Sequence, residues 1–152
     1  MLSCCFTGHR AMSKEEQREI FPQLNIKLSE VIQQGVTVFR NGGALGFDTM
    51  AALCVIKQKE RNPNIKLFID APHRAQSAHW DEFDRHVYTY ILNHADNVTY
   101  VSERYQSGCM QKRNRFMVDR SDIVIAYVRA PRGGAYYTAC YAESLDKQVI
   151  YL

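Results

Sequence analysis

The sequence predicts an α/β fold of Rossmann-like type, a three-layer sandwich around a mainly parallel sheet. Short apolar runs rich in β-branched and aromatic residues alternate along the chain with longer stretches of helical periodicity. No repeat, linker or low-complexity segment interrupts this alternation. Strands that alternate with helices form βαβ units, whose strands run parallel and whose helices cover the sheet. The 152 residues, 46% of them hydrophobic, are expected to form one domain over 1–152.

Six strands and five helices are expected in order. The predicted strands are short apolar runs over residues 2–6, 36–40, 65–71, 98–101, 123–128 and 149–152. The predicted helices have the longer period and cover residues 13–34, 44–59, 78–94, 109–121 and 135–146. The first helix begins at a capping box of Ser13 and Glu16 and ends before Gly35, and Pro22 is expected to kink or divide it. Pro72 ends the third strand because proline cannot donate to the ladder.

The composition indicates a soluble, cytoplasmic protein. No apolar run approaches the ~20 residues of a membrane helix, and the first residues show no basic leader or cleavage site. Five cysteines without CxxC spacing indicate a reducing compartment. No metal site is expected, because the adjacent Cys4 and Cys5 would point to opposite faces of a strand. The net charge of +3 suits an anionic small molecule or weak nucleic-acid contact and requires neither.

Glycine, arginine and other polar residues gather in the loops that follow the first five predicted strands. These loops cover residues 7–10, 41–48, 72–76, 102–110 and 132–134. The carboxyl ends of parallel strands share one edge of a sheet, and open α/β sheets bind ligands in the crevice there. The sequence therefore predicts one binding site, to which all five loops contribute.

Two glycine-rich turns lead from strands into helices, at Gly42-Gly43-Ala44-Leu45-Gly46 and at Gly133-Gly134. Such turns let backbone N–H groups approach an anion, while the helix N-terminus supplies partial positive charge. Neither turn matches a Walker motif or the GxGxxG fingerprint, so each glycine alone is equally consistent with a tight turn that needs positive φ. Two such turns at one edge favour a phosphate site.

Arg10 and Arg113 are the basic residues best placed to neutralise a phosphate, because each lies in a loop or first helical turn at the predicted site. Arg120 lies about 10 Å further along the same helix, at a rise of ~1.5 Å per residue. Arg120 is therefore expected on a solvated helix face, as are Arg104, Lys112 and Arg115.

Three polar residues have both a ligand-binding and a structural interpretation. Asp48 can accept hydrogen bonds from ribose hydroxyls or cap the helix that follows. His9 can donate to phosphate or act as an acid or base, although a histidine beside a turn is more often structural. Asn114 lies on an otherwise apolar helical face and needs a partner, which is either the ligand or a loop carbonyl.

Residues with aromatic or hydroxyl side chains have the same two interpretations. Trp80, with Gln76 nearby, can stack on a base or pack in the core from a helix. Tyr137 and Thr138, near the start of the last helix, can hydrogen-bond the ligand or serve ordinary packing.

Together these motifs resemble the YpsA-like family of the SLOG superfamily, a group of Rossmann-like domains. The resemblance covers nearly the whole chain, from Cys5-Phe6-Thr7-Gly8-His9-Arg10 to Gly133-Gly134 with Tyr137-Thr138. It implies a nucleotide or an ADP-ribose-like ligand, and no cofactor is assigned. The predicted ligand-binding residues are Thr7, Gly8, His9, Arg10, Gly42, Gly43, Ala44, Gly46, Asp48, Pro72, Gln76, Trp80, Arg113, Asn114, Gly133, Gly134, Tyr137 and Thr138.

Two related SLOG families imply alternative functions. Lonely guy phosphoribohydrolases have a PGGxGTxxE motif whose glutamate assists hydrolysis of an N-glycosidic bond. Here Glu143 follows Thr138 by five positions instead of three, which turns its side chain by about 200°, so no catalytic residue is assigned. In the DNA-processing protein A family a similar GGAxGxD loop helps bind single-stranded DNA, but this chain lacks the aromatic-interleaved basic groove of strand binders.

The function predicted first is therefore binding of a phosphate-bearing, nucleotide-derived ligand by a sensor or regulatory protein. Of the two alternatives, hydrolysis of nucleoside monophosphates is placed second and single-stranded DNA binding third. A small-molecule partner is expected, nucleic acid and membrane are not, and a homo-oligomer is left open.

Overall fold

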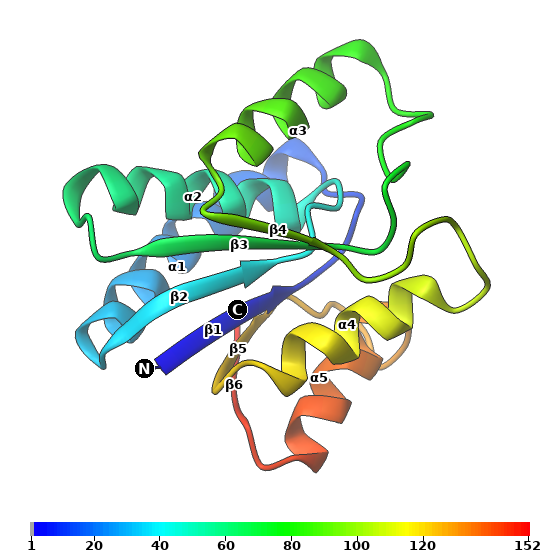
Figure 1. Cartoon of the computed structure of the whole chain (residues 1–152). Coiled ribbons are helices and arrows are strands. Elements are labelled where there is room, and N and C mark those ends of the chain that lie inside the picture. Colours follow the sequence, from blue (N-terminus) through cyan, green and yellow to red (C-terminus); the bar gives the residue numbers. More distant parts are fainter. Residues whose placement is uncertain (1) are drawn as a thin grey trace.

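A computed structural model describes residues 2–152 as six strands that alternate with five helices (Figure 1). The strands are β1 (Leu2–Thr7), β2 (Val36–Asn41), β3 (Lys66–Ala71), β4 (Asn97–Tyr100), β5 (Ile123–Ala126) and β6 (Gln148–Tyr151). The helices are α1 (Lys14–Gln33), α2 (Phe47–Arg61), α3 (Glu82–His94), α4 (Cys109–Asp119) and α5 (Gly134–Ser144). The predicted alternation of strands and helices is confirmed along the described chain.

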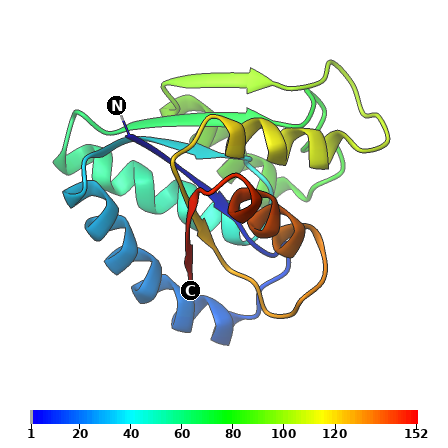
Figure 2. The same cartoon turned by 90° about the horizontal axis from the view of Figure 1, so that it is seen from below.

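All six strands run parallel in one sheet, in the order β4-β3-β2-β1-β5-β6. Helices α1, α2 and α3 cover one face, and α4 and α5 cover the other (Figure 1). From below, Figure 2 shows α4 and α5 side by side across the second face. This arrangement confirms the predicted Rossmann-like three-layer sandwich.

Strand β1 lies in the middle of the sheet and divides the core between its two faces. Cys4 belongs to the larger cluster with Phe6 and Phe47, whereas Cys5 packs with Met117 in a smaller cluster beneath α4 and α5. Both cysteines are fully buried. The two cysteines thus point to opposite faces, as expected for neighbours on a strand.

Helix α1 begins at the predicted capping box and continues through Pro22 without being divided. Ser13 accepts a hydrogen bond from the backbone N–H of Glu16, and the Glu16 side chain accepts from the backbone N–H of Ser13. Pro22 lies on the exposed face, while Ile20 and Leu24 are buried on either side of it. Packing of the apolar stripe offsets the single hydrogen bond that proline removes, so the expected break does not occur.

Helix α3 begins four residues later than predicted, at Glu82 instead of Ala78. Asp81 is its N-cap, with extended backbone and a side chain that accepts from the backbone N–H of Asp84 at 2.8 Å. The residues before it form short turns, and one of these joins the N–H of Trp80 to the carbonyl of Ser77. Trp80 therefore precedes the helix, and its assignment to a helix was wrong.

The strand order places a topological switch point between β1 and β5. From β1 the chain proceeds outward to the edge strand β4, and α4 then returns it to β5 on the other side of β1. The loops after β1 and β5 consequently diverge toward opposite faces, which opens a crevice at their carboxyl ends.

None of the helices within residues 2–152 combines the length and apolar character that crossing a membrane requires. In the same part of the chain, no three His, Cys, Asp or Glu side chains gather closely enough to hold a metal ion.

Candidate functional site

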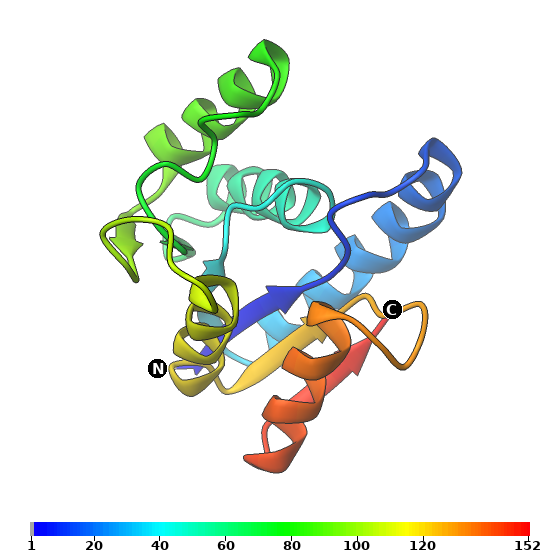
Figure 3. The same cartoon turned by 90° about the vertical axis from the view of Figure 1, so that its right-hand side faces the viewer.

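A cavity of about 220 Å³, here called the central cavity, lies between the loop after β1 and the first turns of α2, α4 and α5. Figure 3 views the molecule from the side on which the strands end. Half of the predicted ligand-binding residues line the cavity: Thr7, Gly8, His9, Arg10, Ala44, Asp48, Arg113, Asn114 and Gly134. Segments far apart in the sequence thus meet at the switch point.

A second cavity, of about 340 Å³, lies between α4 and α5 and is called the α4–α5 cavity. It shares Gln111, Asn114 and Gly134 with the central cavity, so the two adjoin along α4 and α5. It also contains three further predicted residues: Gly133, Tyr137 and Thr138. The second glycine turn therefore serves both cavities.

The three helices whose N-termini border the central cavity have glycine N-caps: Gly46 before α2, Gly108 before α4 and Gly133 before α5. None of these three N-caps is accompanied by a side-chain capping bond. By contrast, Ser13 and Asp81 cap α1 and α3 through side-chain oxygens. The first N–H of α2 donates to the carbonyl of His9, and that of α4 donates to the carbonyl of Gln106. The donors and partial positive charge that face the site are therefore those of the N–H groups that follow in α2 and α4 and of the first turn of α5.

The glycines of the loop after β2 allow close packing around two arginines. A Cβ atom on Gly42 would overlap Nη1 of Arg113, and one on Gly46 would overlap the carbonyl of Arg10. Gly46 also has a φ of +77°, which side-chain-bearing residues rarely adopt. These glycines support the cavity wall rather than merely closing a turn.

Arg113 is almost fully enclosed, with 3% of its surface exposed. Its Nη1 donates to the carbonyl of Gly42 at 2.7 Å, and its Nε donates to Oδ1 of Asn114 at 2.9 Å. Burial lowers the pKa of Arg113, and the nearby Asp48 raises it in part. Arg113 is therefore the partner of the Asn114 oxygen, whereas the Asn114 amide nitrogen makes no hydrogen bond to a loop carbonyl within residues 2–152.

Asp48 does not cap α2, because Gly46 occupies the N-cap position. Its carboxylate accepts a hydrogen bond from the backbone N–H of Ala44 at 3.3 Å and lines the central cavity. Burial raises the pKa of Asp48, and the Coulombic attraction of Arg113 opposes that rise. The site therefore combines a buried carboxylate with a buried guanidinium.

His9 connects the loops after β1 and β5. Its Nε2 accepts a hydrogen bond from the backbone N–H of Arg129 at 3.0 Å, so the neutral ring carries its proton on Nδ1. The ring also packs edge-to-face on Tyr127, and burial together with Arg129 lowers the pKa of His9. The Arg129 side chain donates to Glu16, which ties the same loop to α1.

Stability is expected to fall as the pH drops below about 6.5, the ordinary pKa of histidine. Because the pKa of His9 is lowered in the folded state, the unfolded chain binds its proton first, and stability declines toward the folded-state pKa. His9→Gln is expected to flatten this decline in urea denaturation between about pH 5 and 7. The control is His79→Gln at an exposed turn; an unchanged pH slope in His9→Gln would exclude His9 as its source.

Six predicted residues lie outside the linings of both cavities: Gly42, Gly43, Gly46, Pro72, Gln76 and Trp80. Nε2 of Gln76 donates to the carbonyl of Gly42 and to the hydroxyl of Tyr88, both at 3.2 Å. Trp80 packs edge-to-face on Tyr88 with ring centroids 5.2 Å apart. Gln76 therefore supports the glycine loop from behind, and Trp80 does so through Tyr88. Gly43 packs against the same tyrosine.

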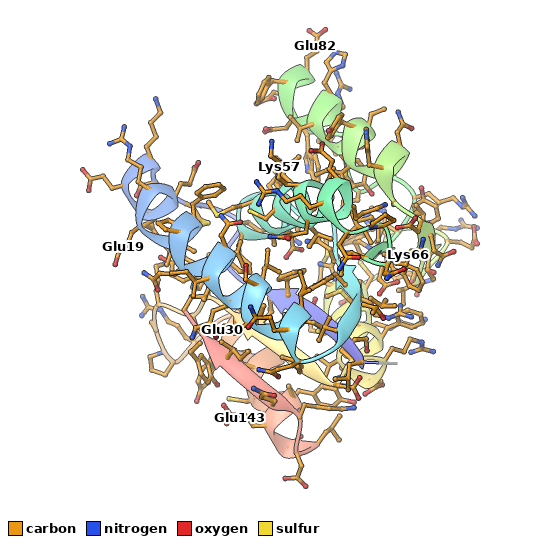
Figure 4. The ribbon with its side chains drawn as sticks, turned by 90° about the vertical axis from the view of Figure 1, so that its left-hand side faces the viewer. Glu19, Glu30, Lys57, Lys66, Glu82 and Glu143 are labelled. Atoms are coloured by element: carbon orange, nitrogen blue, oxygen red, sulfur yellow. The ribbon has the colours of Figure 1, made fainter. Side chains whose placement is uncertain are left out.

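Glu143 lies in the last turn of α5, away from the cavities. The hydroxyl of Tyr151 donates to its carboxylate. Figure 4, viewed from the opposite side to Figure 3, shows Glu143 beside α5 and β6 on the side where the strands begin. Neither cavity includes it in its lining.

Several residues of the site were not predicted from the sequence, among them Gln111, Asp70, Tyr141 and Arg115; Arg115 lines the α4–α5 cavity although it is exposed on its helix. Gln111 lines both cavities, and its only signal was its position one turn before Asn114–Arg115 on α4. Asp70 is fully buried behind Arg113 and accepts hydrogen bonds from Arg40 on β2 at 3.0 and 3.2 Å. The signal that could have found it is a carboxylate inside the apolar run of β3, since an unpaired buried charge is costly and such a group needs a partner.

The parallel sheet and the cavities at its switch point define a Rossmann-like protein. The YpsA family model, described as the YspA SLOG family, matches residues 4–149. The chain therefore belongs to this family, as the motifs indicated.

The chain is similar in sequence to two further proteins and in fold to a solved structure. The SPbeta prophage-derived protein YoqJ of Bacillus subtilis is 31% identical over 138 residues, 80% of this chain and 81% of that protein. A UPF0398 protein of Halalkalibacterium halodurans is 33% identical over 124 residues, 80% of this chain but only 66% of that protein. The solved DNA processing protein A of Helicobacter pylori, described with its single-stranded DNA binding mode, has a TM-score of 0.66 and 19% identity, covering 99% of this chain and 64% of that one. At that identity the likeness shows the fold.

Proposed function

We propose that the protein binds a phosphate-bearing, nucleotide-derived ligand, of the nucleotide or ADP-ribose and NAD type, as a sensor or regulatory protein. The observation that best supports this proposal is that three glycine-capped helix N-termini converge on one cavity, which Arg10 and Arg113 also line. Free backbone donors and guanidinium groups are what phosphate recognition requires. Asp48 supplies an acceptor for ribose hydroxyls beside them.

Binding is favoured over N-glycosidic hydrolysis by the carboxylates available. Of the residues that line the two cavities, Asp48 alone has a carboxyl group, and it is held between Ala44 and Arg113. Glu143 is engaged by Tyr151 elsewhere. We therefore expect no release of free base from nucleoside monophosphates; efficient release that Glu143→Gln abolishes would favour the hydrolase instead.

The described cysteines are all free thiols, four of them buried. This state supports a reducing compartment, and we propose the cytoplasm as the place of action.

A thermal-shift screen tests the proposed function. ADP-ribose, NAD, nucleoside monophosphates and cyclic nucleotides are compared with adenosine, which lacks phosphate. At 100 times its Kd a ligand stabilises the folded state by about 2.7 kcal/mol, which raises Tm by several degrees. Stabilisation by phosphate-bearing compounds but not by adenosine is expected. Stabilisation only by a single-stranded oligonucleotide, lost as salt rises, would replace this proposal with the DNA-binding alternative.

A further inference from the structure

The central cavity alone is small for a nucleotide-derived ligand. Its volume is about 220 Å³, whereas ligand pockets usually measure about 300–1,000 Å³. The adjoining α4–α5 cavity provides a further 340 Å³ or so and shares Asn114 and Gly134 with it. A ligand anchored by phosphate near Gly134 therefore has room to extend between α4 and α5.

Tyr137 presents an aromatic ring to the α4–α5 cavity. The residue lines this cavity yet is 66% exposed, so its ring is accessible to a ligand. Tyr136 packs edge-to-face against it, with ring centroids 5.6 Å apart. An accessible tyrosine ring held by a neighbour is suited to stack on a flat group.

The far end of the α4–α5 cavity is held in place by Tyr141, one helical turn after Tyr137. The Tyr141 hydroxyl donates to Oδ1 of Asp119 at 2.6 Å, and the guanidinium of Arg115 lies 5.6 Å from the centre of its ring. These contacts join α5 to α4 across the cavity. The spacing of the two helices is consequently fixed before any ligand enters.

Polar groups at the junction of the cavities can contact the edge of a heterocycle. Because Oδ1 of Asn114 accepts from Arg113, its Nδ2 is left as a donor, and it has no acceptor among residues 2–152. Thr138 donates its hydroxyl proton to the carbonyl of Gly134 at 2.7 Å and so keeps its oxygen available as an acceptor. A ring with nitrogen and oxygen atoms at its edge matches this donor and acceptor pair.

We infer that the α4–α5 cavity is the subsite for the planar heteroaromatic group of the ligand, a nucleobase that stacks on Tyr137. The phosphate then lies toward Gly134 and Arg113, with the ribose of the nucleotide between it and Tyr137. In a ligand of the ADP-ribose type, the second ribose extends toward Asp48 in the central cavity. This inference rests on the proposed function and names the part of the ligand that each cavity takes.

Calorimetry with AMP, ADP-ribose and ribose 5-phosphate tests the inference, because the last probe has phosphate and sugar but no base. Tyr137→Ala is expected to weaken binding of AMP and ADP-ribose about tenfold and to leave ribose 5-phosphate within about twofold. Tyr137→Phe retains the ring and is expected to bind like the wild type. The control is Tyr90→Ala, an exposed tyrosine on α3 across the sheet.

Equal weakening of all three probes by Tyr137→Ala, or no weakening of any, would overturn the nucleobase subsite while leaving the phosphate site intact. If the wild type bound ribose 5-phosphate as tightly as AMP, the subsite would likewise be excluded. If the wild type bound none of the three probes, both the proposed function and the nucleobase subsite would be excluded.

Discussion

Arg113→Ala is expected to lower the free energy of unfolding by about 3–5 kcal/mol, the usual cost of removing one member of a buried charged group. Arg113 is 3% exposed, bonds Gly42 and Asn114, and offsets the charge of Asp48. Arg120→Ala should cost less than about 1 kcal/mol, because Arg120 is exposed at the end of the same helix, where it bonds the Phe116 carbonyl. Urea denaturation measures both.

The same pair of variants compares the ligand affinity that depends on a residue of the site with that which depends on a residue of the outer helix face. Affinity for ADP-ribose is expected to fall tenfold or more in Arg113→Ala, since a charged hydrogen bond contributes about 1.5–3 kcal/mol. Arg120→Ala should stay within about twofold, because a distant exposed charge is screened by salt. Equal losses in the two variants would place the ligand elsewhere. Should Arg113→Ala unfold at working temperature, Arg113→Lys retains the charge without the planar fork and permits the same comparison.

The stability lost in Arg113→Ala should also depend on pH. Burial raises the pKa of Asp48, and removal of Arg113 removes the main attraction that opposes the rise. A carboxyl group whose pKa is higher in the folded state than its unfolded value of about 3.9 destabilises the folded state as the pH rises from the unfolded-state pKa to the folded-state pKa. The difference between wild type and variant should therefore be smaller near pH 4 than at pH 7. A difference that is constant with pH would exclude Asp48 as its cause.

The fold could be predicted from the sequence because each strand and helix has its own local signal. The capping box at Ser13 and the apolar run of β5 are examples that the structure confirms. Pro22 and Trp80 could not be placed in this way. Whether α1 continues through Pro22 depends on the packing of the buried stripe around Ile20 and Leu24. The start of α3 depends on competition between Asp81 as N-cap and the turns before it.

The site was only partly accessible to sequence reasoning. Parallel strands bring loops to one edge whatever their side chains are, and this topology alone carried the prediction that His9, Asp48 and Arg113 come close together. Which side chains line a cavity and which stand behind it depends on packing across the sheet. Gln76 illustrates this limit, because its bonds to Gly42 and Tyr88 make it a support for the loop.

Three glycine-to-alanine substitutions are expected to differ in sign as well as size, although each adds the same methyl group. At Gly46 the φ is +77° and the new Cβ would overlap the backbone of Arg10, so Gly46→Ala should cost about 3 kcal/mol or more. At Gly108 the φ is +81° but nothing lies within 4 Å, so Gly108→Ala should cost about 1–2 kcal/mol for the backbone conformation alone.

At Gly134, in the first turn of α5, neither penalty applies, because the φ is not positive and nothing lies within 4 Å of the added atom. Gly134→Ala should therefore raise stability by about 0.4–1 kcal/mol, since alanine reduces the freedom of the unfolded chain. Urea denaturation of the three variants measures the order directly. The decisive comparison is Gly46 with Gly108, because Gly46 alone combines the contact with Arg10 and a ψ of −120°, which lies outside the left-handed helical region that Gly108 occupies at ψ 4°. If the two cost the same, the loop after β2 does not pack against the loop after β1 as described, and the wall of the central cavity is not formed by that contact.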